Sequence, residues 1–255
     1  MNTEEFNPII TVKDLQLAYG EHLVLQDVSF DIKEGTCLVV MGGSGCGKST
    51  LLKSMVGLLE PVQGKISISG EMLWAESSNE SKIFNKFGVL FQGGALWSSM
   101  TIRENVALPL EVYTELAEKE IEDIVRYKLS LVGLSGFENF HPSQLSGGMK
   151  KRAGLARALA LDPKILFFDE PSAGLDPITS KRLDDLITEL KESLGMTFVV
   201  ISHELASIFD IADDAIFLDA KFKTLLDRGP PRTLLKESNH QEVVDFLTRN
   251  ESSNN

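Results

Sequence analysis

The chain has 255 residues, 43% of them hydrophobic, and a formal net charge of −12 at pH 7. This length fits one large α/β domain or two small ones, and the negative charge disfavours a nucleic-acid partner bound through its phosphates. The two cysteines, Cys37 and Cys46, are too few for a disulfide framework, so we expect reduced thiols. No apolar run approaches the roughly 20 residues of a membrane-spanning helix, and the N-terminus is acidic rather than signal-like. We therefore expect a soluble or membrane-peripheral protein.

The first part of the chain predicts a small antiparallel β-layer. Residues 10–32 alternate like two antiparallel strands around a turn near Gly20, and residues 66–70 form another short strand. A larger sheet is predicted from five apolar runs, which lie near Leu38, Val89, Leu166, Val199 and Ile216. Because helical segments separate these runs, we expect a doubly wound α/β fold with a parallel sheet. The ligand of such a sheet lies at the carboxyl ends of its strands.

The middle of the chain predicts an inserted helical subdomain, because residues 115–132 are charged with regular apolar spacing. Residues 241–247 predict a short amphipathic helix, and residues 251–255 a frayed tail. We divide the single expected domain, residues 1–255, into an α/β core with its β-layer (10–92 and 162–235), the helical subdomain (93–161) and a C-terminal helix with its tail (236–255).

Residues 42–49 match the phosphate-binding motif G-x-x-x-x-G-K-[ST]. An apolar strand precedes the motif and a helix follows it, so backbone N–H groups and the helix N-terminus can surround phosphate oxygens. Lys48 is predicted to contact the β- and γ-phosphates, and the Ser49 hydroxyl to bind Mg²⁺. The predicted nucleotide-binding residues of this segment are Gly42, Gly43, Ser44, Gly45, Cys46, Gly47, Lys48, Ser49 and Thr50.

Cys46 lies inside this loop, close to the N-terminus of the following helix. A helix N-terminus tends to lower the pKa of a nearby thiol. We therefore expect maleimide to modify Cys46 and Mg-ATP to protect it. The alternative is that Cys46 is only a small residue that fits a tight loop.

Two carboxylates end the apolar strand at residues 165–170. Burying unpaired charge is expensive, so Asp169 and Glu170 are better explained as functional groups than as parts of a core. Asp169 is placed to hold Mg²⁺ through water, and Glu170 to polarise the water that attacks the γ-phosphate.

A second anion-binding segment, Ser146-Gly147-Gly148, opens a long helix. One nucleotide does not need two such sites in one chain. We therefore expect a head-to-tail dimer in which this segment closes over the γ-phosphate of the other subunit; a plain helix cap is the alternative. The basic triplet at residues 150–152 is interpreted as a solvated or interface face.

Taken together, these motifs resemble the ATP-binding subunit of ABC transporters, whose fold is a P-loop NTPase core. The resemblance implies that Tyr19 stacks on adenine, that Gln92 contacts Mg²⁺ and the attacking water, and that His203 contacts the γ-phosphate. It places Asp176 in a loop that crosses the dimer interface. It also implies ATP and Mg²⁺ as ligands, a homodimer of ATPase subunits and a separate integral-membrane permease. Met149 departs from the pattern, since many members have Gln there.

Residues 91–96, 142–149 and 174–179 are similar to segments of the Mla/MCE-type ATPases. This similarity implies phospholipid transport between inner and outer membranes, which maintains outer-membrane lipid asymmetry. It implies a peripheral location on the cytoplasmic face of the bacterial inner membrane and an MCE-domain substrate-binding protein, with a small STAS-domain protein as a further candidate partner. Residues 96–110 are expected to face the permease, with exposed Leu96, Trp97 and Met100 and with Trp97 as the anchor. The alternative is that Trp97 packs inside the helical subdomain.

Other functions stay open. An importer for a small solute such as an amino acid would use the same kind of cassette. A soluble ABC ATPase acting on ribosomes or DNA usually has two cassettes or a long coiled-coil insertion, whereas this chain has one cassette and no heptad run. A non-catalytic regulatory cassette would need a broken site, but Lys48, Asp169, Glu170 and His203 are all present.

Overall fold

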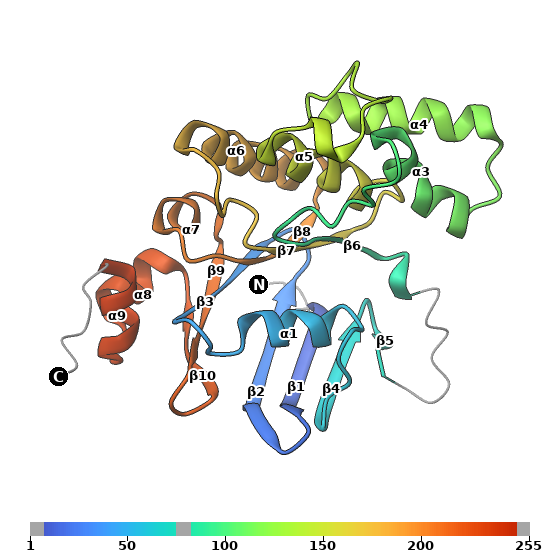
Figure 1. The fold of residues 1–255 in the computed structure, drawn as a ribbon. Coiled ribbons are helices and arrows are strands. Elements are labelled where there is room, and N and C mark those ends of the chain that lie inside the picture. The colour runs from blue at the N-terminus through green and yellow to red at the C-terminus, as the bar shows by residue number, and fades with distance from the viewer. Residues whose placement is uncertain (1–7, 75–82, 249–255) are drawn as a thin grey trace, which may run out of the picture.

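The computed structural model describes residues 8–74 and 83–248, and its centre is a six-stranded sheet (Figure 1). The strand order is β10-β9-β3-β8-β7-β6. The strands are β3 (Cys37–Gly42), β6 (Phe87–Leu90), β7 (Ile165–Asp169), β8 (Thr197–Ile201), β9 (Asp214–Asp219) and β10 (Thr224–Gly229). The five predicted strands are parallel, which confirms the predicted core sheet. The antiparallel edge strand β10 was not predicted; it follows β9 after a short turn and contains no fully buried residue.

A second, four-stranded sheet has the order β2-β1-β4-β5. Its strands are β1 (Pro8–Tyr19), β2 (His22–Lys33), β4 (Gln63–Ile68) and β5 (Glu71–Met72). The strands β1 and β2 pair antiparallel with Tyr19 opposite His22, so the predicted hairpin is confirmed and Tyr19 stands at its tip. This sheet is the predicted small β-layer.

The helices are α1 (Lys48–Met55), α3 (Ile102–Tyr113), α4 (Glu118–Leu131), α5 (Gly147–Ala158), α6 (Pro177–Leu194), α7 (Leu205–Ile211), α8 (Pro231–Glu237) and α9 (Gln241–Thr248). Figure 1 shows α3 to α6 together on one side of the parallel sheet, with α1 and the β-layer on the other. The predicted helix at 241–247 is confirmed as α9, whereas the predicted tail at 251–255 lies outside the described residues.

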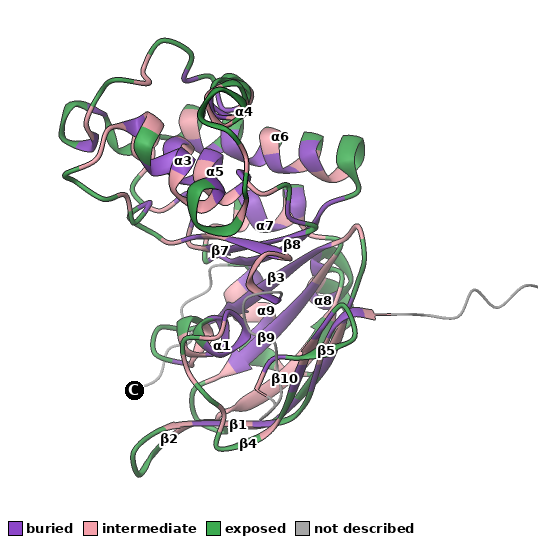
Figure 2. Ribbon diagram, turned by 90° about the vertical axis from the view of Figure 1, so that its right-hand side faces the viewer, coloured by how far each residue is buried: buried purple, intermediate pink, exposed green. Residues whose placement is uncertain are grey.

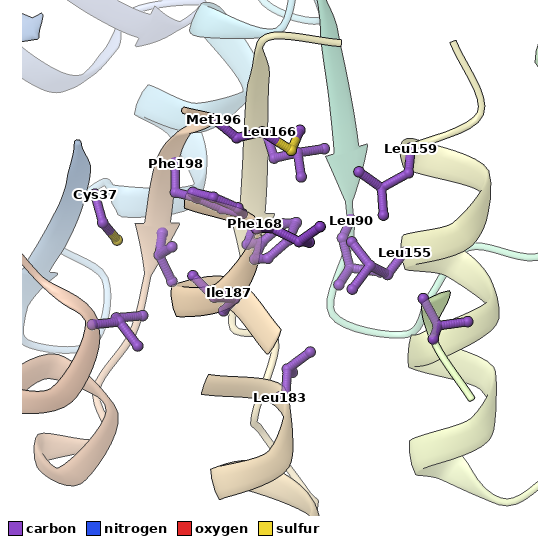
Figure 3. Packing of buried hydrophobic residues seen from close by; sticks show 14 of the residues in the cluster. Cys37, Leu90, Leu155, Leu159, Leu166, Phe168, Leu183, Ile187, Met196 and Phe198 are labelled. Atoms are coloured by element: carbon purple, nitrogen blue, oxygen red, sulfur yellow. The ribbon is translucent and has the colours of Figure 1, made fainter. Parts of the chain in front are cut away.

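The parallel sheet separates two hydrophobic cores. Figure 2 shows its strands β3, β7, β8 and β9 coloured largely as buried. Alternate residues of β3 face opposite cores, because side chains in a strand alternate between its faces: Cys37 and Val39 belong to the core with α3 to α6, and Leu38 and Val40 to the core with α1 and the β-layer. Figure 3 shows the first core, where the rings of Phe168 and Phe198 pack edge to face with centroids 5.6 Å apart. Each such buried ring stabilises the fold by about 1.5–3 kcal/mol.

Helix α5 lies directly against β6 because both elements have a glycine at the contact. A Cβ atom at Gly88 would collide with the carbonyl oxygen of Ala158, and a Cβ at Gly154 would lie 2.9 Å from the carbonyl oxygen of Gly94. The guanidinium of Arg157 donates to the carbonyl oxygens of Ala95 (2.8 Å) and Gly94 (3.0 Å). The segment that follows β6 is therefore fixed to α5. No helix in the described ranges is both long and apolar enough to cross a membrane.

Candidate functional site

The loop between β3 and α1 has the backbone of a phosphate cradle. Gly47 caps α1 with a φ of 101°, in a region that residues with side chains rarely occupy. At Gly42, with a φ of 143°, a Cβ would collide with the carbonyl oxygen of Leu218 on neighbouring β9. The ammonium of Lys48 donates to the carbonyl oxygens of Gly42 and Gly43, each at 2.8 Å. The Lys48 ammonium thus lies across the loop, where phosphate oxygens can replace these two carbonyl oxygens as its hydrogen-bond acceptors.

This loop forms the floor of a cavity of about 730 Å³. The cavity is lined by Tyr19, His22, Val24, Gly42, Gly43, Ser44, Gly45, Gly47, Lys48, Ser49, Thr50, Glu170, His203 and Phe246. Most of the predicted nucleotide-binding residues are therefore brought together, with the half-exposed Tyr19 at one wall. Phe246 of α9 was not predicted; its ring packs edge to face on Phe217 of β9. This contact between distant segments, which the sequence does not reveal, helps to hold α9 beside the cavity, together with the burial of Val243 and Leu247 in the first core.

Ser49 and Asp169 meet beside this loop. The Ser49 hydroxyl donates to the Asp169 carboxylate at 3.3 Å. Burial raises the pKa of Asp169 above its usual value, and the hydrogen bond from Ser49 partly offsets this effect. Within residues 8–74 and 83–248, no group of three or more His, Cys, Asp or Glu side chains is arranged so that it could hold a metal ion by itself. The two oxygen donors fit Mg²⁺, which commonly takes one or two protein oxygens and completes its shell with water and substrate phosphates.

Glu170 lies between His203 and Gln92. The Nδ1 atom of His203 is 3.1 Å from Oε1 of Glu170, and Nε2 of Gln92 donates to Oε2 at 3.5 Å. The three residues follow β7, β8 and β6, so neighbouring parallel strands deliver them to one edge of the sheet. Glu170 has a φ of 49°, a left-handed backbone that is uncommon for a residue with a side chain. The Glu170 carboxylate, with His203 and Gln92 beside it, can accept a proton from a water molecule next to a bound phosphate.

The second predicted anion site lies apart from this cavity. Ser146, Gly147 and Gly148 line a separate hollow of about 240 Å³ together with Asp176. Ser146 is the N-cap of α5, and its hydroxyl accepts from the backbone N–H of Met149 at 3.3 Å. Asp176 caps α6, since its carboxylate accepts from the backbone N–H groups of Ile178 and Thr179. These residues cap helices in the single chain and do not reach its own phosphate loop.

Two sequence interpretations are wrong. Cys46 is buried and does not line the cavity, and burial raises the pKa of its thiol despite the nearby Lys48 ammonium. We therefore no longer expect it to react readily with maleimide, because the thiolate is the reactive form. The basic triplet is not a solvated face, which contradicts that part of its interpretation: Lys151 is only 6% exposed, and Arg152 donates to the carbonyl oxygen of Val132 at 2.9 Å. Its interpretation as an interface face stays a prediction.

The segment after Gln92 is also arranged differently from the prediction. Trp97 is 59% exposed, which contradicts the alternative that it is buried in the helical subdomain. Leu96, however, is partly buried against the first core, and Met100 is only partly exposed. Asn105, which is buried, holds the segment by accepting from the backbone N–H of Trp97 at 2.8 Å and donating to three backbone carbonyls.

The sequence model of the ABC transporter family matches residues 25–173, more than half of the chain, and the chain therefore belongs to this family. It is an ABC ATPase, a class of protein that binds and hydrolyses ATP. The ATP-binding protein MlaF of the intermembrane phospholipid transport system of Haemophilus influenzae is 41% identical, over 94% of this chain and 90% of its own length. MlaF of Escherichia coli K12 is 40% identical, over 84% and 80%.

A protein of Mycobacterium leprae described as the probable ribonucleotide transport ATP-binding protein mkl is 43% identical over 93% of this chain. The chain spans 68% of its length. Among solved structures, cbiO1 of Clostridium perfringens, part of the ABC transporter complex cbiONQ, superposes with a TM-score of 0.81 at 27% identity, over 96% of each chain. The cassette MJ0796, solved as a dimer in a post-hydrolysis state with ADP and phosphate, has a TM-score of 0.79 at 31% identity, over 87% of this chain and 98% of its own. These similarities confirm the predicted fold class.

Proposed function

We propose that this chain is the ATP-hydrolysing subunit of a transporter that moves phospholipid between the inner and outer membranes and so maintains outer-membrane lipid asymmetry. The observation that carries the enzymatic part is the position of the Glu170 carboxylate. It lines the same cavity as Lys48 and lies within hydrogen-bonding distance of both His203 and Gln92. A carboxylate with two polar neighbours beside a phosphate cradle is suited to water activation.

In the proposed reaction, ATP occupies the cavity with its adenine on Tyr19 and its phosphates in the loop 42–50. Lys48 exchanges its carbonyl partners for the β- and γ-phosphate oxygens. Glu170 accepts a proton from water as the water oxygen bonds to the γ-phosphorus and the bond to the β–γ bridging oxygen breaks, which leaves ADP and phosphate. His203 and Gln92 hold the carboxylate and contact the γ-phosphate and the attacking water.

Ser49, Asp169 and Gln92 are the proposed protein ligands of Mg²⁺, with Asp169 acting through water. When bound, the metal would neutralise charge on the β- and γ-phosphate oxygens. Burial raises the pKa of Asp169, and a bound cation would favour its ionised form.

Completion of the site requires a second copy. Ser146, Gly147, Gly148 and Asp176 lie together on a surface separate from the cavity. In a head-to-tail homodimer, this surface would close over the γ-phosphate held by the partner subunit. The N-terminus of α5 then supplies N–H donors and a partial positive charge. The dimeric state of the related cassette MJ0796 supports this arrangement.

The domain division proposed from the sequence gives each part a task. Residues 10–92 and 162–235 would bind the nucleotide, residues 93–161 would contact an integral-membrane permease, and residues 236–255 would follow as a C-terminal helix and tail. Trp97 supports the permease contact, because a large exposed aromatic side chain is typical of an interface anchor. The location is peripheral, on the cytoplasmic face of the bacterial inner membrane. An MCE-domain substrate-binding protein and a STAS-domain protein complete the proposed partners.

Phospholipid is favoured as substrate because the match to H. influenzae MlaF extends over 90% of that protein, whereas the match to the mycobacterial protein named for ribonucleotide transport covers 68% of it. The test is the ATPase rate of the chain purified with its permease in detergent, with phospholipid, ribonucleotides or amino acids added in turn. We expect stimulation by phospholipid only, and none in the Lys48→Ala complex. Stimulation by ribonucleotides or amino acids, without phospholipid stimulation, would reject the lipid assignment.

A further inference from the structure

The side chain of Lys151 extends from the helical subdomain to the backbone turn that begins at Glu170. Lys151 lies on α5, five residues after Ser146, and is only 6% exposed. Its ammonium donates to three backbone carbonyl oxygens, those of Glu170 (3.4 Å), Pro171 (2.7 Å) and Ala173 (2.5 Å). All three donor positions of a lysine are thus directed at one turn of the backbone.

The turn at residues 170–173 needs such support. Glu170 has a φ of 49°, and a left-handed backbone at a residue with a side chain persists only where its surroundings hold it. The backbone N–H of Glu170 donates to the carbonyl oxygen of Ile201 at 3.0 Å, which fixes one side of the turn. The Lys151 ammonium fixes the other side. Burial lowers the pKa of Lys151, and the Glu170 carboxylate opposes this effect by favouring the charged form.

The same helix is bonded to the segment that carries Gln92. Arg157 donates to the carbonyl oxygens of Gly94 and Ala95, and the backbones of Gly154 and Gly94 are in close contact. Helix α5 therefore connects, through named contacts, the cap Ser146 at its start, the segment after Gln92 and the turn after β7. A shift of α5 must move this turn or break the bonds of Lys151.

We propose that Lys151 is a positioning residue of ATP hydrolysis, whose ammonium sets the backbone of residues 170–173 and so couples the placement of the Glu170 carboxylate to the position of α5. This inference rests on the role proposed for Glu170. It assigns to Lys151 no contact with ATP, since Lys151 does not line the nucleotide cavity.

The test is a kinetic double-mutant cycle of Lys151→Met and Glu170→Gln in the complete transporter complex. Methionine keeps the length of the side chain and removes its donors. We expect Lys151→Met to lower kcat by roughly 10- to 100-fold, as small misplacements of reacting groups do, and to leave the dissociation constant of ATP within about threefold. In the Glu170→Gln background, the same substitution should change the residual rate less than about twofold, because the effects of substituting residues that act as a unit are not additive.

Lys150→Met is the matched control, since Lys150 is the preceding residue on α5 and its side chain has no hydrogen bond or ion pair within the described ranges; we expect a normal kcat. Lys151→Gln, which keeps two N–H donors, should recover part of the rate. Equal losses in both Glu170 backgrounds, a normal kcat in a folded Lys151→Met complex, or failure of both Lys151 variants to fold would each overturn the inference. A normal rate for Glu170→Gln alone would instead overturn the role proposed for Glu170.

Discussion

The imidazole Nδ1 atom of His203 lies 3.1 Å from the carboxylate oxygen Oε1 of Glu170, although the two residues are separated by 33 positions in the chain. They follow the neighbouring parallel strands β8 and β7, so the sheet brings them to the same edge. The contact links the residue proposed to accept a proton from water with the one proposed to contact the γ-phosphate.

Glu170→Gln should bind ATP and hydrolyse it about 10²- to 10⁴-fold more slowly, because glutamine keeps the shape but cannot act as a base. The nucleotide-bound dimer should therefore accumulate. Size-exclusion chromatography of the subunit at saturating ATP is the measurement, with Lys48→Ala as the variant that should stay monomeric. A monomeric profile for Glu170→Gln at saturating ATP would contradict the two-copy site.

Ser146→Arg should allow ATP binding in the isolated subunit and block turnover, because the larger side chain would occupy the pocket for the partner's γ-phosphate. Ser143→Arg is a suitable control, since Ser143 is also exposed and lies three residues earlier. ATPase rates of complexes with defined ratios of wild-type and Ser146→Arg subunits give the answer. Each mixed dimer should keep at most one competent site, so mixed dimers with the full activity of wild-type dimers would show that Ser146 does not act across the interface.

Trp97→Ala should weaken co-purification with the permease and leave the melting temperature of the isolated subunit within about 2 °C, because most of the side chain is solvent-exposed. Asn105→Ala should behave differently, since it removes the bonds that hold the segment; we expect a loss of about 1–3 kcal/mol in the free energy of unfolding. Undiminished co-purification of Trp97→Ala would reject its role as an anchor.

Asp184 gives a pH dependence of stability. Burial raises the pKa of this carboxyl, which accepts from the Ser207 hydroxyl at 2.7 Å, to about 6, and the nearby Asp210 and Glu204 add to the effect. The folded state therefore binds more protons than the unfolded state between the ordinary pKa of an aspartate and pH 6, and stability must fall as pH rises through this window.

Asp184→Asn should remove this fall, because asparagine imitates the protonated acid. At pH 7.5 we expect the variant to be more stable than wild type by on the order of 2 kcal/mol. Urea unfolding of both proteins between pH 4 and pH 8 is the measurement. Parallel stability curves over this range would show that Asp184 does not titrate as described.

Local patterns were sufficient to predict much of this fold. The hairpin of β1 and β2 and the five parallel strands follow from alternation and from short apolar runs, and the phosphate loop follows from its glycines between a strand and a helix. The edge strand β10 was missed because its residues are only partly buried and show no apolar run.

The errors concern contacts that are distant in sequence. The sequence predicts a solvated or interface face for the basic triplet, yet the carbonyl groups that surround the Lys151 ammonium belong to a turn about 20 residues later in the chain. The thiol of Cys46 was expected to be activated by the helix N-terminus, but packing of the loop buries it. Phe246 lines the cavity because α9 packs on the core, with the Phe246 ring against Phe217 of β9. Local sequence patterns do not predict which distant segment of the chain packs over a given side chain.

ATP-dependent transfer of a fluorescent phospholipid tests the proposed function most directly. The complete complex is reconstituted in proteoliposomes, and transfer to the MCE-domain partner is measured with the wild-type subunit and with Glu170→Gln. We expect transfer that depends on ATP with the wild-type subunit and a loss to the background rate with Glu170→Gln. ATP hydrolysis by the wild-type complex without any lipid transfer, or equal transfer with Glu170→Gln, would contradict a lipid transporter driven by this site.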